Sequence, residues 1–413
     1  IFFYKLLQAR FNNYILSILG VLLVFASPRI FSESFYNSKD ILFLSLTIIN
    51  LYFSFKFINS QSTKNLIFYS ISTGLLINAR IMGLIFPILT FSIIFFEFMD
   101  NNKILTNKLK KAFLSFLIII FVVFLFWPFM WTNTFEKLIF YFKFVEELAV
   151  FTNTYFGKTF LSDQTPWHFK FVWISITIPF VVLFFSIFGF LIMLYKFFVR
   201  IINLEETKKL WFSMTERYDF FIFFLLLFPL ITILIFTNNF DGWRHYYYIY
   251  PFLVYLLVFA LSEIKKINYK FFNLLLFFVS INLISSSYWM IKFHPHQYTY
   301  FNFIHKHIIK KSFNIDYMGL SLYQSLNYIL KRDQRETIRV SSLGETSVKG
   351  SSLMLDKIQQ KRLKFVNYKE ADYIIDTFRP KVGKKIFIDT NIFSKYYELI
   401  VDKNVVNRIY KRK

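Results

Sequence analysis

The sequence predicts an all-α polytopic membrane bundle followed by a small α/β domain outside the membrane. Three observations predict it. Apolar residues make up 56% of the 413 residues, with 60 Phe. Long apolar runs broken by short polar loops fill the first 290 residues, as expected for membrane spans. Residues 291–413 are instead polar and basic, with 24 Lys and Arg against 11 Asp and Glu.

The apolar runs give about nine predicted transmembrane helices, since a span needs about 20 apolar residues. They are 11–27, 41–58, 65–80, 82–99, 112–131, 172–198, 219–237, 246–262 and 271–290. The third and fourth are short and meet at Asn78-Ala79-Arg80. The alternative is one long kinked helix, which would reverse the topology of everything that follows.

Loop charges favour nine separate spans. Lysine and arginine are in excess in alternate loops, for example around 103–111, 196–209 and 265–270, whereas the opposite loops mix both signs. Basic loops stay on the cytoplasmic side. The chain is therefore predicted to start inside, and its C-terminal tail is predicted to lie outside.

Two regions outside the spans carry their own patterns. In the loop 132–170, EKLIFYFKFVEEL has apolar residues at helical spacing and predicts a helix lying in the membrane interface; a plain connecting loop is the alternative. In 291–413, a helix is predicted at 321–332, strands at 337–343, 362–368 and 371–378, and a hairpin at 396–413 that turns at 402–404. The predicted domains are therefore 1–290 and 291–413.

Composition also excludes several classes of function. The chain has no cysteine, so it has neither disulfides nor a thiol nucleophile. The net charge of +23 could suggest nucleic acid, but membrane topology explains it better and no nucleic-acid partner is expected. No P-loop, GxGxxG, HExxH or GxSxG motif occurs. Because Ile1 lies within an apolar stretch, we expect an N-terminal part to be missing.

Asp40 is the candidate catalytic acid. It lies where the loop Arg29–Asp40 meets the next span, and ionisable groups at such depth are functional candidates. A carboxylate there can act as a general base or help to hold a divalent cation. The structural alternative is that Ser38 or Asp40 caps the following helix.

Three arginines, Arg29, Arg80 and Arg244, fall at predicted outside ends of helices. Guanidinium forks bind phosphate oxygens in bidentate fashion, so the three suit a lipid phosphate or a sugar phosphate. The alternative is that they snorkel to the lipid headgroups.

Aromatic residues and histidines gather near the same predicted face. Trp243-Arg244-His245 leads into three tyrosines, and Trp167, His294 and Tyr298 lie in similar contexts. The structural alternative is an aromatic belt at the membrane interface, which is common at helix ends. The histidines do not have the spacing of a zinc site.

Several short motifs, in their order, resemble bacterial glycosyltransferases of the GT-C fold. The relatives are the protein O-mannosyltransferases and the aminoarabinose transferase of lipid A, in glycosyltransferase family 39. The motifs are Ser27-Pro28-Arg29-Ile30-Phe31, then Ser34-Phe35-Tyr36-Asn37-Ser38-Lys39-Asp40, Gly242-Trp243-Arg244-His245 before Tyr250-Pro251, His294-Pro295 with Gln297-Tyr298 and Tyr300-Phe301-Asn302, and Asp316-Tyr317 with Gly319-Leu320-Ser321.

The resemblance implies an enzyme that takes a sugar from a polyprenyl-phosphate donor to a lipid, glycan or protein acceptor. It implies a bacterial inner-membrane protein whose active site and C-terminal domain face the periplasm. Asp40 matches the family's second acid; the loop with the first acid would precede Ile1. No cofactor is certain, although Mg²⁺ or Mn²⁺ could bind at Asp40. Expected donor-phosphate ligands are Arg29, Arg80, Arg244 and His245; expected lipid or acceptor contacts are Tyr36, Trp167, Trp243, His294 and Tyr298.

Two other functions remain open from the sequence. A transporter or flippase for a lipid-linked saccharide should carry charge at mid-membrane depth, whereas charges here gather at one face. A membrane-anchored binding protein that acts through residues 291–413 is the third hypothesis.

Overall fold

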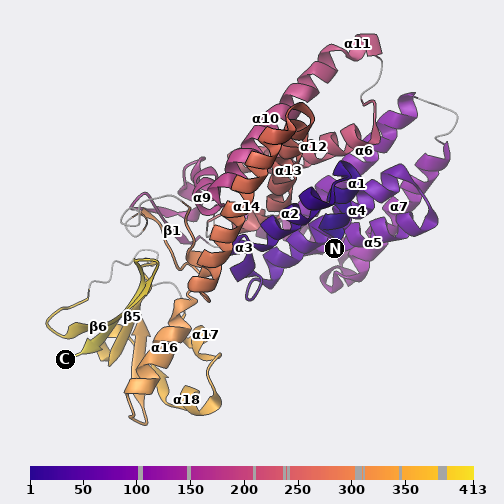
Figure 1. Cartoon of the computed structure of the whole chain (residues 1–413). Helices are drawn as coiled ribbons and strands as arrows, with labels where there is room; N and C mark the ends of the chain where they lie inside the picture. The colour runs from indigo at the N-terminus through magenta and orange to yellow at the C-terminus, as the bar shows by residue number, and fades with distance from the viewer. Residues whose placement is uncertain are drawn as a thin grey trace. The chain divides into compact units, whose positions relative to one another are not determined.

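The computed structural model describes residues 1–100, 106–146, 150–207, 211–235, 239, 242–302, 309, 312–343, 347–379 and 388–413. The chain forms two compact units (Figure 1). The first unit comprises Ile1–Leu148, Ile178–Leu234 and Arg244–Tyr288; the second comprises Ala149–Thr177, Ile235–Trp243 and Trp289–Lys413. The expected boundary near 291 thus has a counterpart at Trp289, and the second unit also takes in two earlier segments.

The first unit is helical. Its helices are α1 (Phe2–Phe11), α2 (Tyr14–Phe25), α3 (Pro28–Glu33), α4 (Ser38–Asn59), α5 (Thr63–Ala79), α6 (Ile85–Asp100), α7 (Thr106–Leu125), α8 (Thr134–Glu146), α10 (Phe180–Ile202), α11 (Leu204–Thr207), α12 (Met214–Ile235), α13 (Tyr250–Ile267) and α14 (Tyr269–Lys292), the last of which crosses the unit boundary. The 3₁₀ turns η1 (Ile81–Leu84), η2 (Pro128–Trp131) and η4 (Arg244–Ile249) connect some of them.

Five helical segments in the described part of the chain are long and apolar enough to cross a membrane. They are Ser38–Asn59, Phe180–Ile202, Met214–Ile235, Arg244–Ile267 and Tyr269–Lys292. Two further apolar helices, Tyr14–Phe25 and Ile81–Glu97, are shorter. The chain is thus compatible with an integral membrane protein. Helical structure occurs in all nine predicted ranges, but nine crossings are more than these five helices establish.

Breaks between α-helices fall within two of the predicted spans. The range 11–27 begins at a break, because Asn12 adopts a left-handed conformation (φ 45°) and ends α1, and the Asn13 side chain caps α2. The range 172–198 holds two helices, α9 (Phe169–Thr177) and α10. Proline at 179 provides no backbone N–H and disfavours the helical conformation at the residue before it, so the chain breaks there.

The break at Asn78-Ala79-Arg80 agrees with the prediction of separate helices. Arg80 is extended (φ −157°), so α5 ends at Ala79, and η1 and α6 follow. The interruption therefore places the side chain of Arg80 at a helix end rather than within a continuous helix.

Close helix contacts hold the first unit together. A Cβ atom at Gly189 of α10 would overlap the backbone carbonyl of Leu256 in α13, so only glycine permits this approach. Beside it, the Ser186 hydroxyl donates to the Leu253 carbonyl at 2.7 Å. Small residues and hydroxyl bonds of this kind are typical of helix packing in membranes. Helix α13 is largely buried among the others, whereas most of α14 is not.

The far end of α4 carries a separate polar cluster. Arg217 of α12 pairs with Glu97 of α6, and its Nη2 donates to Asn59 Oδ1 at 2.8 Å. Asp219, two residues after Arg217 in α12, accepts two hydrogen bonds of 2.7 and 2.6 Å from Arg10 at the end of α1. These pairs join the ends of helices α1, α4, α6 and α12.

The second unit contains a five-stranded mixed sheet in the order β4-β3-β5-β7-β6. Strands β3 (Ile338–Ser342), β4 (Leu363–Phe365) and β5 (Tyr373–Asp376) are parallel, and β6 (Phe393–Val401) and β7 (Asn404–Arg412) form the antiparallel hairpin. Helix α16 (Ser321–Arg332) packs its apolar side on the sheet; α17 (Val348–Ser352) and α18 (Lys357–Lys361) precede β4. The predicted helix, strands and hairpin are all present.

The earlier segments of the second unit add structure that the sequence analysis missed. Strands β1 (Thr152–Tyr155) and β2 (Lys158–Leu161) form a hairpin within the predicted loop 132–170, and α9 follows. Trp173 of α9 is buried and contacts the rings of Phe301, Phe313 and Tyr317. The predicted helix in EKLIFYFKFVEEL is present as α8; its position in a membrane interface stays a prediction.

The close contact of α10 with α13 gives a stability prediction. We expect Gly189→Ala to lower the free energy of unfolding by about 1–3 kcal/mol, because overpacking against a backbone atom cannot be relieved by a rotamer change. Gly20→Ala is the matched control: its new Cβ would mainly meet Leu7 Cδ1, the flexible end of a side chain. Thermal unfolding of the purified protein in detergent measures both. Equal stability of the two variants would contradict the assigned packing.

Candidate functional site

The candidate site is built at the start of α4. Asn37, not Ser38 or Asp40, caps this helix: its Oδ1 accepts the backbone N–H of Asp40 at 3.1 Å. This corrects the capping alternative considered from the sequence. The carboxylate of Asp40 is therefore available for contacts with other segments of the chain.

Two arginines from distant segments meet at Asp40. Arg80, at the end of α5, forms an ion pair with Oδ1 of Asp40 through its Nη2 atom. Arg244, the first residue of η4, approaches Oδ2 through Nη1 at 3.5 Å. The structure thus brings together three of the residues that the sequence analysis singled out.

Burial differs between the acid and the two cations. The Asp40 side chain is 2% exposed, whereas the side chains of Arg80 and Arg244 are 16% and 22% exposed. Lys39, on the same turn, is exposed, and the positive charges of both arginines act on it. The buried carboxylate of Asp40 therefore faces two arginines, and their partly open guanidinium groups can also reach an anion from outside.

A second buried carboxylate belongs to the same cluster. The amide Nδ2 of Asn37 donates to Glu33 Oε2 at 2.6 Å and to Asp40 Oδ2 at 2.7 Å. The Tyr247 hydroxyl donates to Glu33 Oε1 at 3.3 Å. Because one amide bridges both acids, they lie close together despite their like charge. The sequence analysis missed this role of Glu33 and Asn37, because the bridge depends on the turn between α3 and α4.

The other predicted ligands of the first unit lie nearby in the sequence. Arg29 is buried in α3, and Tyr36 is half-buried between α3 and α4. His245 follows Arg244 in η4 and is half-buried. Their roles as phosphate, lipid or acceptor contacts stay predictions. Asp241, in the predicted loop Asp241–His245, lies outside the described residues.

The remaining predicted contacts belong to the second unit. Trp243 is buried, and its Nε1 donates to Thr177 Oγ1 at 2.8 Å. Trp167 is 60% exposed, and the exposed His294 shares a hydrogen bond with Gln297. Tyr298 is buried. Of these residues, Trp167 and His294 present side chains at the surface of their unit, where a lipid or acceptor could reach them.

A polar cluster around His296 connects the segment after α14 to α16. His296 Nε2 lies 2.8 Å from Gln324 Oε1, and Nδ1 lies 3.1 Å from the Tyr298 hydroxyl. Burial lowers the pKa of His296, so its neutral form is favoured, and burial raises the pKa of the nearby Asp316 carboxyl. Asp316 accepts from the backbone of Leu320 and Ser321 at the start of α16. These contacts are structural, because each member is engaged within the unit.

Among the described residues of the first unit, Glu33 and Asp40 form a pair of acids near the arginines. Within the described ranges, no group of three or more His, Asp or Glu residues has the arrangement of a metal site. Glu33 and Asp40 provide carboxylate oxygens of the type that Mg²⁺ and Mn²⁺ prefer. A divalent cation at this pair would need further oxygen ligands from a substrate or from water.

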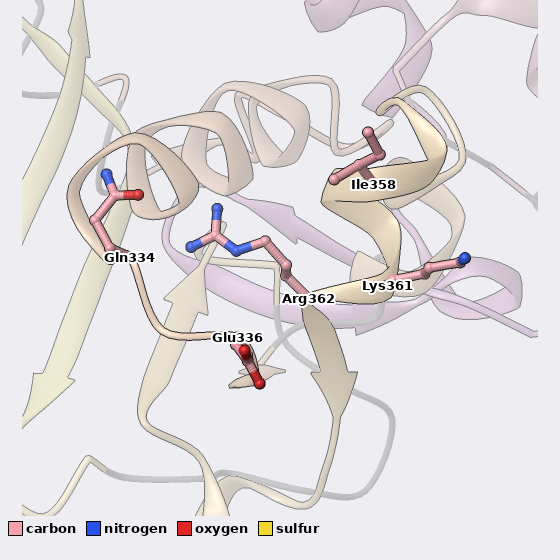
Figure 2. Close-up of a pocket in the computed structure, with 5 residues that line it drawn as sticks. All are labelled: Gln334, Glu336, Ile358, Lys361 and Arg362. Carbon is pink, nitrogen blue, oxygen red and sulfur yellow. The ribbon is translucent and has the colours of Figure 1, made fainter.

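An open hollow of about 590 Å³ lies in the C-terminal domain, lined by Gln334, Glu336, Ile358, Lys361 and Arg362 (Figure 2). The guanidinium of Arg362 donates to the carbonyls of Leu330, in the last turn of α16, and of Asp333 and Arg335 just after it. Because this arginine satisfies the end of a helix, its role is structural, and we do not assign the hollow to the chemistry of the site.

Comparison with known proteins gives no family for this chain. No protein-family model matches it, and no curated protein and no solved structure shows a significant match. The function is therefore argued from the chemistry of the site itself.

The bridging amide of Asn37 gives a second prediction. We expect Asn37→Ser to lower the free energy of unfolding by about 1–3 kcal/mol, because serine keeps the helix cap but leaves the two buried carboxylates without their shared donor. The exposed Ser38→Ala is the control and should change stability by less than about 0.5 kcal/mol. Chemical denaturation in mild detergent measures both. If Asn37→Ser is as stable as the wild type, the bridge contributes nothing.

Proposed function

We propose that this protein is a membrane glycosyltransferase that moves a sugar from a polyprenyl-phosphate donor to an acceptor at the outer membrane face. One observation carries the proposal: the partly exposed guanidinium groups of Arg80 and Arg244 meet at the buried carboxylate of Asp40. The resemblance to the GT-C glycosyltransferases supports the same reading.

The charges of the cluster fit a phosphate. Guanidinium groups bind phosphate oxygens in bidentate fashion, and two of them can neutralise the charge that grows on a leaving phosphate. The site lies at the N-terminal end of α4, an apolar helix long enough to cross a membrane. A donor with its isoprenoid tail in lipid would present its phosphate at such a helix end.

The acids supply the other half of the proposed reaction. A carboxylate, Asp40 or the neighbouring Glu33, accepts the proton of the acceptor hydroxyl. The acceptor oxygen then forms a bond to the anomeric carbon as the bond from that carbon to the phosphate oxygen breaks. The bonding electron pair leaves with the polyprenyl phosphate. Mg²⁺ or Mn²⁺ bound at the carboxylates is part of the proposal as an additional source of positive charge.

The proposed orientation places the site and residues 291–413 in the periplasm of a bacterial inner membrane. Reporter fusions test it. Fusions after residues 105 and 205 should report the cytoplasm, and a fusion after residue 300 should report the periplasm, because the basic loops stay inside. A cytoplasmic signal after residue 300 would exclude an outward-facing site in this arrangement.

Donor transfer provides the direct test. The purified protein is reconstituted in nanodiscs and given undecaprenyl-phosphate sugars. We expect Arg244→Ala to weaken donor binding strongly and Arg244→Lys to restore only part of it, since lysine lacks the planar fork. Arg335→Ala, which removes an exposed arginine of the C-terminal domain, is the matched control and should bind normally. Unchanged donor affinity in Arg244→Ala would contradict phosphate binding by Arg244 and favour the alternative that it contacts lipid headgroups.

Asp40→Asn tests the proposed acid in the same assay, in purified variant protein that remains folded and binds the donor. The variant keeps the size of the side chain and removes the negative charge, so transfer should slow by roughly 100-fold or more. Near-normal turnover would show that Asp40 is not the acid of the reaction. Movement of an intact lipid-linked sugar across the bilayer, with no sugar transferred, would favour the flippase alternative.

A further inference from the structure

The turn between α17 and α18 exposes large aliphatic side chains on a domain that contains none of the five apolar spans. Leu353 is 73% exposed, Met354 58% and Ile358 78%. Between them, Leu355 is 5% exposed and packs into the main core of the C-terminal domain, as does Val348 of α17. The backbone of the turn is thus fixed to the core while its other apolar side chains project outward.

Cations surround this apolar group. Lys349, Lys357 and Lys361 are all exposed, and none forms an ion pair with another residue of the described structure. The only acid between 347 and 364 is Asp356, whose side chain accepts the backbone N–H of Gln359 at 2.7 Å and caps α18. In Figure 2 the Lys361 amine is directed away from the Arg362 guanidinium, on the same short helix as Ile358. The surface therefore combines apolar protrusions with unneutralised positive charge.

This combination suits an anionic lipid surface. Aliphatic side chains enter the boundary between headgroups and acyl chains, while lysines next to them interact with lipid phosphates. A sugar polymer would call for aromatic planes, which are missing among Leu353, Met354 and Ile358. A purely electrostatic contact would not call for exposed leucine and isoleucine.

The position of the domain in the chain points to the same partner. Helix α14, one of the five candidate spans, ends at Lys292, and the C-terminal domain follows it. A domain tethered next to a bilayer meets lipid at a high effective concentration, so even a weak contact becomes populated. A separate protein partner has no such advantage.

We propose that the α17–α18 turn docks on the anionic headgroups of the membrane that holds the spans, through Leu353, Met354 and Ile358 and the three lysines. The proposal rests on the membrane-spanning helices and is independent of sugar transfer. Docking would limit the orientations that the C-terminal domain can adopt. Each lysine next to an anionic surface should favour the docked state about 5-fold, so the three together should favour it about 100-fold.

The absence of cysteine makes the test direct. Met354→Cys in the whole protein is labelled with an environment-sensitive fluorophore and reconstituted in vesicles of phosphatidylcholine, with or without phosphatidylglycerol. Ser394→Cys, at an exposed position of β6, is the matched control. We expect a blue shift at position 354 and quenching by acyl-chain nitroxide lipids in the anionic vesicles, with neither effect at position 394.

The charge dependence supplies the second measurement. In anionic vesicles, changing Lys349, Lys357 and Lys361 together to Gln should remove most of the blue shift of the label at 354, as should high salt. A label at 354 that behaves like the one at 394 overturns the proposal. A second result also overturns it: a blue shift that nitroxide lipids do not quench and that decreases when the protein is diluted among more vesicles. That result indicates contact with another protein copy.

Discussion

The burial of Asp40 against Arg80 and Arg244 is the interaction on which the architecture of the site depends. A buried carboxylate is tolerated only when opposite charges and hydrogen bonds compensate it, and removal of one partner from such a pair typically costs about 3–5 kcal/mol. Satisfying this one acid fixes the start of α4, the end of α5 and the start of η4 relative to one another. The amide of Asn37 adds Glu33 to the same group. The cluster is thus a structural junction as well as a candidate site for an anion.

The polar groups of the first unit are separated by an apolar length that matches a membrane. Helix α4 has 22 residues, which corresponds to roughly 33 Å. Asp40 lies in its first turn, and Asn59, which binds Arg217, is its last residue. The hydrocarbon core of a bilayer is about 30 Å thick. Charge is costly in that core, so clusters at the two ends of α4 and apolar surface between them form the arrangement expected of a spanning helix.

The C-terminal domain has the organisation of a small α/β domain, with a sheet, a hairpin turn and a helix that covers one side of the sheet. Its hairpin turns at Asp402 and Lys403, which both have positive φ, the geometry that suits the twist of the two strands. Helix α16 covers one side of the sheet, and the cap at its start comes from Asp316. The turn between α17 and α18 departs from this pattern, because it places Leu353 and Ile358 in the open. That departure is why it stands out as a contact surface rather than as part of the core.

The sequence by itself determined the features that depend on neighbouring residues. Apolar length and period located the helices; alternation and turn residues located the hairpin of β6 and β7; and the polar interruption at Asn78-Ala79-Arg80 separated α5 from α6. It also singled out Asp40, Arg80 and Arg244 individually. Only the tertiary structure decided that these three side chains meet and that Asn37 bridges two acids beside them. The reason is physical: local periodicity specifies which face of a helix is apolar, whereas contacts between distant residues depend on how the helices rotate and how closely they approach one another. Gly189, for example, allows α10 to approach α13 closely.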